Sequence, residues 1–249
     1  MTTSAPKRIL VTPRSLSRDG HPDLARLTDA GYEVTFGPPG QQPSEAELLQ
    51  LLPGCVAMLA GVEPISAEVL ERAQAEGLRV IARNGVGVDN IDLAVAQRLG
   101  IEIRRTVGAN ARGVAELTIG LLLALARSLP FSDVAIKQNK WERRKGIELL
   151  GRTLGIVGCG AIGRSVVHMA LGLGMRVLAF DPMRDPVFDP PQGLAWAELD
   201  EVFSACDAIT LHCPAQPDGR PLVDAAALER VRPGALLINT ARAELLDEE

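Results

Sequence analysis

The sequence has few aromatic residues, few cysteines and few histidines. Phe, Trp and Tyr make up only 3% of its 249 residues, so a core must consist mainly of Leu, Val, Ile and Ala, which suits buried parallel strands under helices. The four cysteines are Cys55, Cys159, Cys206 and Cys213, and no two form a C-x-x-C pair. Together with only three histidines, this spacing argues against a structural zinc site or a disulfide framework. We expect no metal, and buried thiols in a reducing cytoplasm.

The sequence also lacks an excess of positive charge and a long hydrophobic run. A formal net charge of -5 gives no electrostatic reason to expect binding to nucleic acid or to an anionic membrane. The most apolar run, residues 117–126, has about 10 residues, whereas a membrane-spanning helix needs about 20. No apolar stretch long enough for a signal peptide follows the charged first residues. With 47% hydrophobic and 23% charged residues, the composition is that of an ordinary globular protein, and we expect it in the cytoplasm.

Short apolar runs alternate with helix-like segments over the first hundred residues. Three of the predicted helices end at a glycine, which can adopt the left-handed conformation of a helix cap. Alternation of this kind indicates βαβ units and a parallel sheet with helices on both faces. The predicted strands are 9–11, 32–36, 56–59, 78–82 and 101–103, and the predicted helices are 22–30, a segment capped by Ser44, 66–76 and 91–99.

The pattern changes after residue 106 and then resumes. Residues 110–129 predict one long apolar helix and residues 131–140 a second. Further strands are predicted at 154–157, 175–180, 208–211 and 235–238, with helices at 162–173, 197–203 and 224–230. Long helices between two α/β runs are typical of a domain junction, which we place near residue 107. The sequence therefore predicts an α/β protein with two Rossmann-like or flavodoxin-like parallel-sheet domains, residues 1–107 and 108–249.

One glycine-rich segment matches a dinucleotide-binding pattern. Residues 158–163 (GCGAIG) fit G-x-G-x-x-G, follow a predicted strand and open a predicted helix. A second strand ends at Asp181, 18 residues after Gly163. In this context Gly158 allows the tight turn, Gly160 lets the backbone approach a pyrophosphate, and Gly163 lets the helix pack close to the strand. A turn with only a structural role is the alternative, and the strand–turn–helix context disfavours it.

Asp181 bears on which dinucleotide would bind. Its carboxylate can accept hydrogen bonds from the ribose hydroxyls of the adenosine half and should repel a 2′-phosphate. The sequence therefore favours NAD over NADP. Arg184 lies three residues further on, and its positive charge could weaken this preference.

Other polar loops follow predicted strands and should lie at the same kind of edge, because open α/β sheets bind ligands beyond the carboxyl ends of their strands. They are 212–214 (HCP), 239–242 (NTAR) and, in the first domain, 83–90 (RNGVGVDN). The glycines of the last loop expose backbone N–H groups that could bind a small carboxylate. Arg242 could bind a carboxylate through two parallel hydrogen bonds, although a solvated surface arginine is also consistent with its position.

The chain resembles the D-isomer-specific 2-hydroxyacid dehydrogenases, and within them the D-3-phosphoglycerate dehydrogenase branch. The similar segments occur in the family's order and cover nearly the whole chain. They are 83–93 (RNGVGVDNIDL), 110–116 (NARGVAE), 140–144 (KWERR), 148–164 (ELLGRTLGIVGCGAIGR), 180–182 (FDP), 212–214 (HCP) and 239–247 (NTARAELLD). The resemblance implies a flavodoxin-like substrate-binding domain, an NAD-binding Rossmann domain, and reversible hydride transfer between NAD(H) and the C2 carbon of a small 2-hydroxy or 2-oxo acid.

The same resemblance implies roles for individual residues. Arg242 would be catalytic, orienting the substrate carboxylate and polarising the carbonyl. Val86 and Gly87 would bind that carboxylate through backbone N–H groups, with Arg83 and Asn110 as further substrate-binding residues. The cofactor contacts implied by the resemblance are Ala161, Ile162, Asp181, Cys213, Pro214, Thr240 and Ala241. We expect the same role for the motif glycines Gly158, Gly160 and Gly163 and for Pro182, His212 and Arg242. Family members are usually homodimers joined through the nucleotide-binding domains, with the helices of residues 110–140 in the interface.

The chain departs from the family pattern at its end. The family completes its site with a glutamate and a histidine downstream of the catalytic arginine, and the histidine is the general acid and base. The sequence ends at Glu249, before either residue, so we expect a Rossmann domain that is incomplete at its C-terminus. Two explanations stay open. One is a longer enzyme; the other is a catalytically silent NAD(H)-binding regulatory or scaffold protein.

Two smaller departures concern the substrate. Bacterial phosphoglycerate enzymes commonly place an arginine after the strand that matches residues 56–59, whereas residues 60–63 (AGVE) contain no cation. Arg83 and the basic cluster at 141–145 are other sources of positive charge, so a phospho- or phosphono-substituted acid stays an option. Ala243 also replaces the glycine that usually follows the catalytic arginine.

Overall fold

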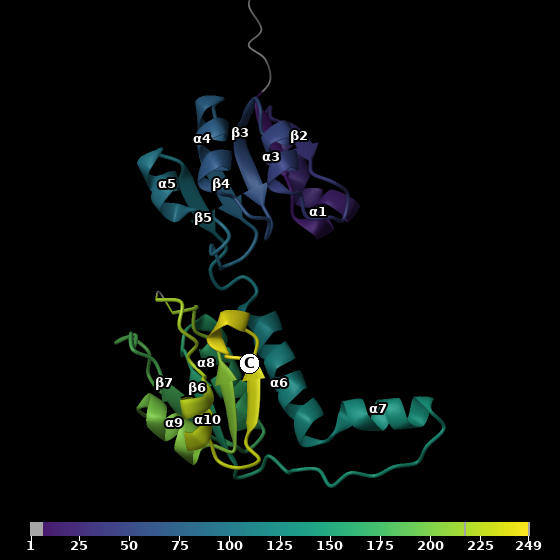
Figure 1. Ribbon diagram of the computed structural model, residues 1–249, viewed down its shortest axis with the longest axis vertical. Coiled ribbons are helices and arrows are strands. Elements are labelled where there is room, and N and C mark those ends of the chain that lie inside the picture. The colour runs from purple at the N-terminus through teal and green to yellow at the C-terminus, as the bar shows by residue number, and fades with distance from the viewer. Residues whose placement is uncertain (1–6, 217, 249) are drawn as a thin grey trace, which may run out of the picture. The chain divides into compact units, whose positions relative to one another are not determined.

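The computed structural model describes residues 7–216 and 218–248, so the outer limits predicted for the two domains, residues 1 and 249, lie outside the described residues. The chain divides into two compact units (Figure 1): the first ends at Ala109 and the second begins at Asn110. This division lies close to the junction predicted near residue 107. Each unit has its own sheet and its own hydrophobic core.

The first unit is built on a five-stranded parallel sheet in the order β2-β1-β3-β4-β5. This is the flavodoxin order, in which the direction of winding switches between β1 and β3. The strands are β1 (Arg8–Val11), β2 (Glu33–Phe36), β3 (Cys55–Ala60), β4 (Val80–Arg83) and β5 (Glu102–Arg105). The helices are α1 (Arg14–Asp19), the 3-10 turn η1 (Pro22–Leu24), α2 (Ala25–Asp29), α3 (Glu45–Leu51), α4 (Ala67–Ala75) and α5 (Leu93–Arg98).

Three helices of the first unit are capped by the polar side chain of the residue that directly precedes them. Ser44 accepts a hydrogen bond from the N–H of Glu47, and the Glu47 carboxylate accepts one from the N–H of Ser44 at 2.8 Å, which forms a complete capping box. Ser66 caps α4 and Asp92 caps α5 in the same way, each by accepting from a backbone N–H. These caps satisfy backbone donors that would otherwise lack partners.

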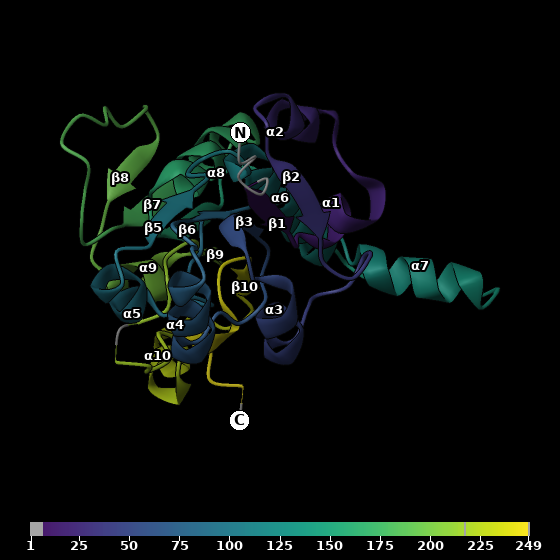
Figure 2. The same cartoon turned by 90° about the horizontal axis from the view of Figure 1, so that it is seen from above.

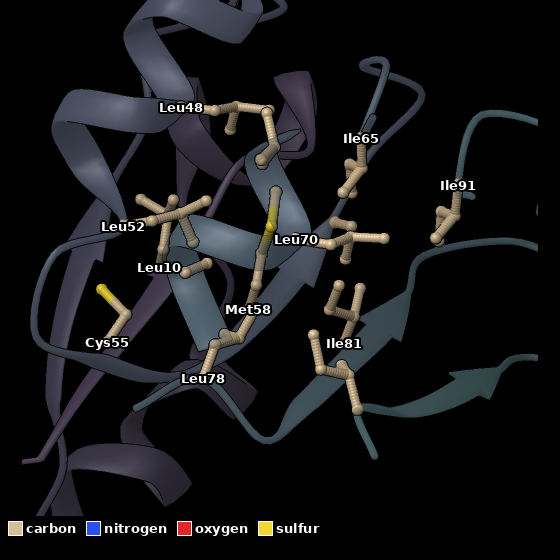
Figure 3. Packing of buried hydrophobic residues seen from close by; sticks show 14 of the residues in the cluster. Leu10, Leu48, Leu52, Cys55, Met58, Ile65, Leu70, Leu78, Ile81 and Ile91 are labelled. Carbon is tan, nitrogen blue, oxygen red and sulfur yellow. The ribbon is translucent and has the colours of Figure 1, made fainter. Parts of the chain in front are cut away.

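The core of the first unit lies between the sheet and helices α3 and α4 (Figure 3). Leu10, Met58 and Ile81 come from three neighbouring strands, and Leu48 and Leu70 come from the two helices. All five side chains are almost completely buried. Aliphatic packing of this kind is what the shortage of aromatic residues predicts.

The second unit is built on another five-stranded parallel sheet, in the order β10-β9-β6-β7-β8. Numbered within the unit, this is the Rossmann order 3-2-1-4-5, in which the winding switches between β6 and β9. The strands are β6 (Thr153–Val157), β7 (Arg176–Phe180), β8 (Leu194–Trp196), β9 (Ala208–Leu211) and β10 (Leu236–Asn239). The helices are α6 (Ala111–Ala126), α7 (Leu129–Lys137), α8 (Ala161–Gly172), α9 (Leu199–Ala205), α10 (Ala225–Arg230) and the 3-10 turn η2 (Ala243–Leu245). The predicted fold class is confirmed.

The segment predicted as one helix over 110–129 differs from the structure. Helix α6 ends at Ala126 and α7 begins at Leu129, with Ser128 in the left-handed region at φ 52°. Pro130 has no N–H to donate to the Ala126 carbonyl, which instead accepts the N–H of Ile147 at 2.7 Å. The chain therefore turns at this point, and Figures 1 and 2 both show α7 extending away from the sheet of its unit.

No single helix of the described residues is long and apolar enough to cross a membrane. Only α6 and α7 taken together would be long and apolar enough, and the axes of these two helices differ by a bend of 67°. One face of α6 is buried, through Ala115, Thr118 and Leu122, and packs on α8 and β10. This contact makes α6 part of the core of the second unit.

The structure also adds three short elements that the sequence did not predict. Helix α1 contains no buried residue and so carries no hydrophobic pattern. Strand β8 has only three residues and pairs with β7 after a long irregular loop. Turn η2 follows directly after β10 and Arg242.

Candidate functional site

The polar loops predicted in the second unit lie along one edge of its sheet. Strands β7, β6, β9 and β10 are hydrogen-bonded neighbours in register, so their carboxyl ends are adjacent. They are followed in that order by Asp181 and Pro182, by the glycine turn at 158–160, by residues 212–214, and by residues 240–242. Since neighbouring strands lie about 4.8 Å apart, this row spans about 14 Å. It suits an elongated ligand.

The glycine motif, residues 158–163, has two positions that only glycine fits. Gly158 has φ 93°, and a Cβ there would lie 2.8 Å from the backbone N of Cys213. A Cβ on Gly163 would lie 2.2 Å from the carbonyl oxygen of Gly158, so this glycine allows α8 to pack against the turn. At Gly160, by contrast, a Cβ would meet nothing within 4 Å. The open space above Gly160 is therefore accessible to a ligand.

The start of α8 provides unpaired backbone donors beside that space. Gly160 is the N-cap residue and has no side chain to accept from the first N–H groups of the helix. Ala161 and Ile162, the first two helical residues, have no intrahelical acceptor for their N–H groups. With the positive end of the helix dipole, these donors suit a phosphate. The residues present therefore fit the pyrophosphate of a dinucleotide.

The carboxylate of Asp181 is half-buried and already accepts two backbone hydrogen bonds. Its Oδ2 accepts the N–H of Cys159 and its Oδ1 that of Met183, both at 2.8 Å. A carboxylate has about four acceptor positions, so two are left for ribose hydroxyls. Arg184 lies over the ring of Trp196 at 5.0 Å and 3.7 Å from the Glu198 carboxylate. These contacts direct the Arg184 guanidinium toward β8 and Glu198.

His212 and Cys213, which follow β9, are held without charge. Both ring nitrogens of His212 are shielded from solvent and have no hydrogen-bond partner among the described residues. Burial lowers the pKa of His212 to about 4 and raises the pKa of the Cys213 thiol. Burial also raises the pKa of the Cys159 thiol, in the glycine turn, to about 11. These three side chains therefore carry no charge near neutral pH.

The low pKa of His212 predicts how stability depends on pH. The unfolded chain takes up a proton at His212 near pH 6.5, whereas the folded chain does so only near pH 4. The free energy of unfolding should therefore fall as the pH is lowered from 6.5 to 4, by about 3 kcal/mol in total. Urea denaturation at pH 7 and pH 4.5 should show a smaller pH effect in His212→Leu than in the wild type. Equal pH effects in the two proteins would contradict this assignment.

The loop after β10 is fixed around Arg242. The Asn239 side chain accepts from the N–H of Ala241 at 2.9 Å and donates to the carbonyl of Arg242 at 2.6 Å. The Thr240 hydroxyl lies 3.0 Å from that of Thr118 on α6. Arg242 is half-buried, and its Nη1 donates to the Ala241 carbonyl at 2.9 Å. Sequence analysis named Asn239 only as part of the polar loop 239–242 and did not name Thr118, although asparagine at a strand end often binds the backbone of the next turn.

In the first unit, the predicted carboxylate loop follows β4. Gly85 has φ 150°, and its carbonyl accepts the N–H of Thr106 at 3.1 Å. Within residues 7–216 and 218–248, no hydrogen bond is formed by the N–H groups of Val86 and Gly87. These two donors suit an anion. Asn110, in contrast, belongs to the second unit, where it is exposed at the start of α6.

A cavity of about 330 Å³ lies at the switch point of the first sheet, where the segments at the carboxyl ends of β1, β2, β3 and β4 meet. Its lining includes Arg14, Arg83 and the carboxylate of Glu63. Glu63 is almost fully buried and accepts hydrogen bonds from the Thr12 hydroxyl and, at 2.9 Å, from the N–H of Gly61. Arg14 and Glu63 were not predicted as site residues, because no sequence motif contains them.

Known proteins resemble the chain in both sequence and structure. Residues 119–249 match the family model described as D-isomer specific 2-hydroxyacid dehydrogenase, NAD binding domain. A hydroxypyruvate reductase of Thermotoga maritima is 38% identical over 206 residues, which are 82% of this chain and 66% of that protein. Human D-3-phosphoglycerate dehydrogenase is 36% identical over 225 residues, which are 89% of this chain and 41% of that protein. The chain thus spans less than two thirds of the length of these relatives.

Among solved structures, the TT0316 protein of Thermus thermophilus superposes with a TM-score of 0.85 at 36% identity, over 96% of this chain and 75% of the other. A cofactor (NAD+) bound 3-phosphoglycerate dehydrogenase of Entamoeba histolytica superposes with a TM-score of 0.79 at 26% identity, over 98% and 74% of the two chains. Both the predicted family and the predicted cofactor, NAD, are confirmed. The roles predicted for single residues stay predictions.

Proposed function

Because this chain belongs to the D-isomer-specific 2-hydroxyacid dehydrogenase family, we propose that it transfers a hydride between NAD(H) and the C2 carbon of a small 2-hydroxy or 2-oxo acid. The observation that carries this proposal is the order of loops along the carboxyl edge of the second sheet. Asp181 lies at one end of that row, the glycine turn lies next to it, and Arg242 lies at the other end. When bound, NAD(H) supplies or accepts the hydride.

In this proposal each part of the row has one task. Asp181 accepts the ribose hydroxyls, and the N–H groups at the start of α8 bind the pyrophosphate. Arg242 binds the substrate carboxylate through two parallel hydrogen bonds, and its positive charge polarises the neighbouring C2 carbonyl. The two hydrogen bonds of the Asn239 side chain keep the backbone around Arg242 in one conformation. Val86 and Gly87 stay predicted donors to the carboxylate.

We further propose that the acid carries a phosphate or phosphonate group. The support is the cavity at the switch point of the first sheet, because two of its lining residues, Arg14 and Arg83, carry positive charge. Guanidinium groups form strong paired hydrogen bonds with phosphate oxygens. The negative charge of Glu63 in the same cavity is stabilised by its own donors, Thr12 and Gly61.

A panel of 2-oxo acids, with and without a phosphate or phosphonate group, tests both proposals. Oxidation of NADH is followed by its absorbance. We expect turnover of at least one acid and a lower KM for its phosphorylated form, with the KM difference lost in Arg83→Ala. Equal KM values would overturn the phosphate proposal alone. A chain that binds NADH but turns over none of the acids would support the catalytically silent alternative.

Asp181 makes a prediction about cofactor choice. The wild-type protein should bind NADH much more tightly than NADPH, because the carboxylate accepts ribose hydroxyls and repels a 2′-phosphate. Asp181→Ala should weaken NADH binding by about tenfold and narrow the gap between the two cofactors. Fluorescence titration with each cofactor measures both effects. Equal affinity of the wild type for NADH and NADPH would refute this role.

We also propose that a second copy of the chain covers the exposed apolar surface of α6 and α7. Leu117, Leu121 and Leu125 recur every four residues on α6 and are 56%, 39% and 46% exposed. Leu129 and Ile136 of α7 are more than half exposed. Apolar surface of this extent is typical of a protein interface, and in a closed dimer the same surface would serve on both copies. A monomeric mass by light scattering at micromolar concentration would contradict this proposal.

A further inference from the structure

Arg164, the residue after the glycine motif, contacts the glycine turn from within its own unit. Its Nε donates to the carbonyl oxygen of Cys159 at 3.1 Å. Its Nη2 donates to the Asp185 carboxylate at 2.9 Å, and its guanidinium lies over the ring of Phe188 at 4.3 Å. The side chain is 31% exposed. Three different groups thus hold this arginine in one orientation.

These contacts determine the orientation of one peptide group. The carbonyl of Cys159 and the N–H of Gly160 belong to the same planar trans peptide and point in opposite directions. Because Arg164 holds the carbonyl on one side, the Gly160 N–H must point to the other side. No hydrogen bond to that N–H is formed within the described residues, and the Cβ position of Gly160 faces open space.

The preceding peptide is held independently. The N–H of Cys159 donates to Asp181, so the two ends of Cys159 are bound by two different side chains. Asp185 also accepts the N–H of Val187 at 2.9 Å, which fixes its carboxylate for the ion pair with Arg164. Phe188 packs edge-on against Trp196 of β8, with the ring centroids 6.2 Å apart. The loop after β7 is thereby connected to the glycine turn through Arg164.

From this geometry we propose that Arg164 is a positioning residue for the cofactor: it aims the Gly160 N–H at the pyrophosphate of NAD(H). This inference rests on the proposed function. Arg164 would act through the Cys159–Gly160 peptide and would not itself contact the substrate or the cofactor. This role requires the planar guanidinium, because one group must bind the Cys159 carbonyl and Asp185 at the same time. A lysine in its place would keep the charge, but its ammonium group has neither the two fixed donor directions used toward the Cys159 carbonyl and Asp185 nor the planar surface that lies over Phe188.

The test compares ligands that contain a pyrophosphate with one that lacks it. Calorimetry measures the Kd of NADH and of ADP-ribose, and ligand-observed NMR measures that of adenosine. In Arg164→Met, we expect NADH and ADP-ribose to bind at least tenfold more weakly and adenosine to bind within twofold of the wild type. Arg164→Lys should weaken the pyrophosphate ligands severalfold despite its positive charge.

Arg152→Met is the matched control. Arg152 also forms an ion pair with an aspartate of the same unit, Asp207, at 3.0 Å, but it lies next to the amino end of β6, at the opposite edge of the sheet. We expect Arg152→Met to lower the midpoint temperature of thermal unfolding, because the ion pair is lost, and to leave the Kd of ADP-ribose unchanged.

Several results would overturn the positioning role. They are an unchanged Kd of ADP-ribose in Arg164→Met, an equal loss for adenosine and ADP-ribose, wild-type affinity in Arg164→Lys, and an equal loss in Arg152→Met. Failure of the wild-type protein itself to bind NADH is a different result, since it would overturn the proposed function together with this inference.

Discussion

Replacing Arg242 with alanine is expected to lower kcat/KM for the best 2-oxo acid by about a thousandfold, the size of effect seen when one group that stabilises developing charge is removed. NADH affinity should stay within about twofold of the wild-type value, because most of the proposed cofactor contacts come from the glycine turn and Asp181, which follow β6 and β7, and the backbone of the loop that contains Arg242 is kept in the alanine variant. Initial rates with varied acid and varied NADH separate the two effects.

The loss should appear in both kcat and KM. A guanidinium that only held the carboxylate would change KM alone, whereas one that also polarises the C2 carbonyl acts in the transition state and changes kcat. Arg232→Ala is the control and should keep the wild-type kcat/KM. Arg232 lies before β10, at the amino edge of the sheet, whereas Arg242 follows β10 at the carboxyl edge. The Arg232 guanidinium lies 3.3 Å from the Asp207 carboxylate. Wild-type kcat/KM in Arg242→Ala would remove this residue from the proposed mechanism.

Replacing Gly163 with alanine should have a large effect on cofactor binding. The added methyl would lie 2.2 Å from the carbonyl oxygen of Gly158, and a backbone atom inside a turn cannot move as a flexible side chain can. Helix α8 would have to shift away from the turn, which costs about 1–3 kcal/mol in stability. The shift also moves the N–H groups at the start of the helix, so we expect NADH to bind at least tenfold more weakly.

The same helix offers a control for this substitution. Gly172 ends α8, is exposed, and would place a Cβ within 4 Å of nothing. Gly172→Ala should therefore leave the NADH affinity unchanged and raise the free energy of unfolding by up to about 1 kcal/mol, the difference in helix propensity between the two residues. If calorimetry gave Gly163→Ala the NADH affinity of the wild type, close packing of α8 on the turn would not matter for binding.

The order of sheet and helix could be predicted because its signals are local. Apolar runs, glycine stops and a serine such as Ser44 at a helix start each depend on a few neighbouring residues. The glycine motif could be recognised because the strand before it and the helix after it also have clear patterns. Those features position the turn and Asp181 at one sheet edge, as the structure has them.

What could not be predicted depends on contacts between distant residues. The end of α6 is stabilised by the N–H of Ile147, which no pattern around Ala126 indicates. Likewise, the role of Asn239 in its loop and the contact of Arg164 with Asp185 depend on how loops fold back in space. The cavity beside Arg14 is assembled from four segments that are far apart in the chain, one at the carboxyl end of each of the strands β1, β2, β3 and β4.

Every loop proposed to contact the dinucleotide follows a strand of the second unit. The sheet of the first unit has a separate switch point, with its own cavity lined by charged residues. If the cavity recognises the acid as proposed, substitutions around it should alter which acid is accepted and leave the nucleotide-binding loops of the second unit unchanged. In such an arrangement, new substrates can be acquired during evolution by changing one half of the molecule and conserving the other.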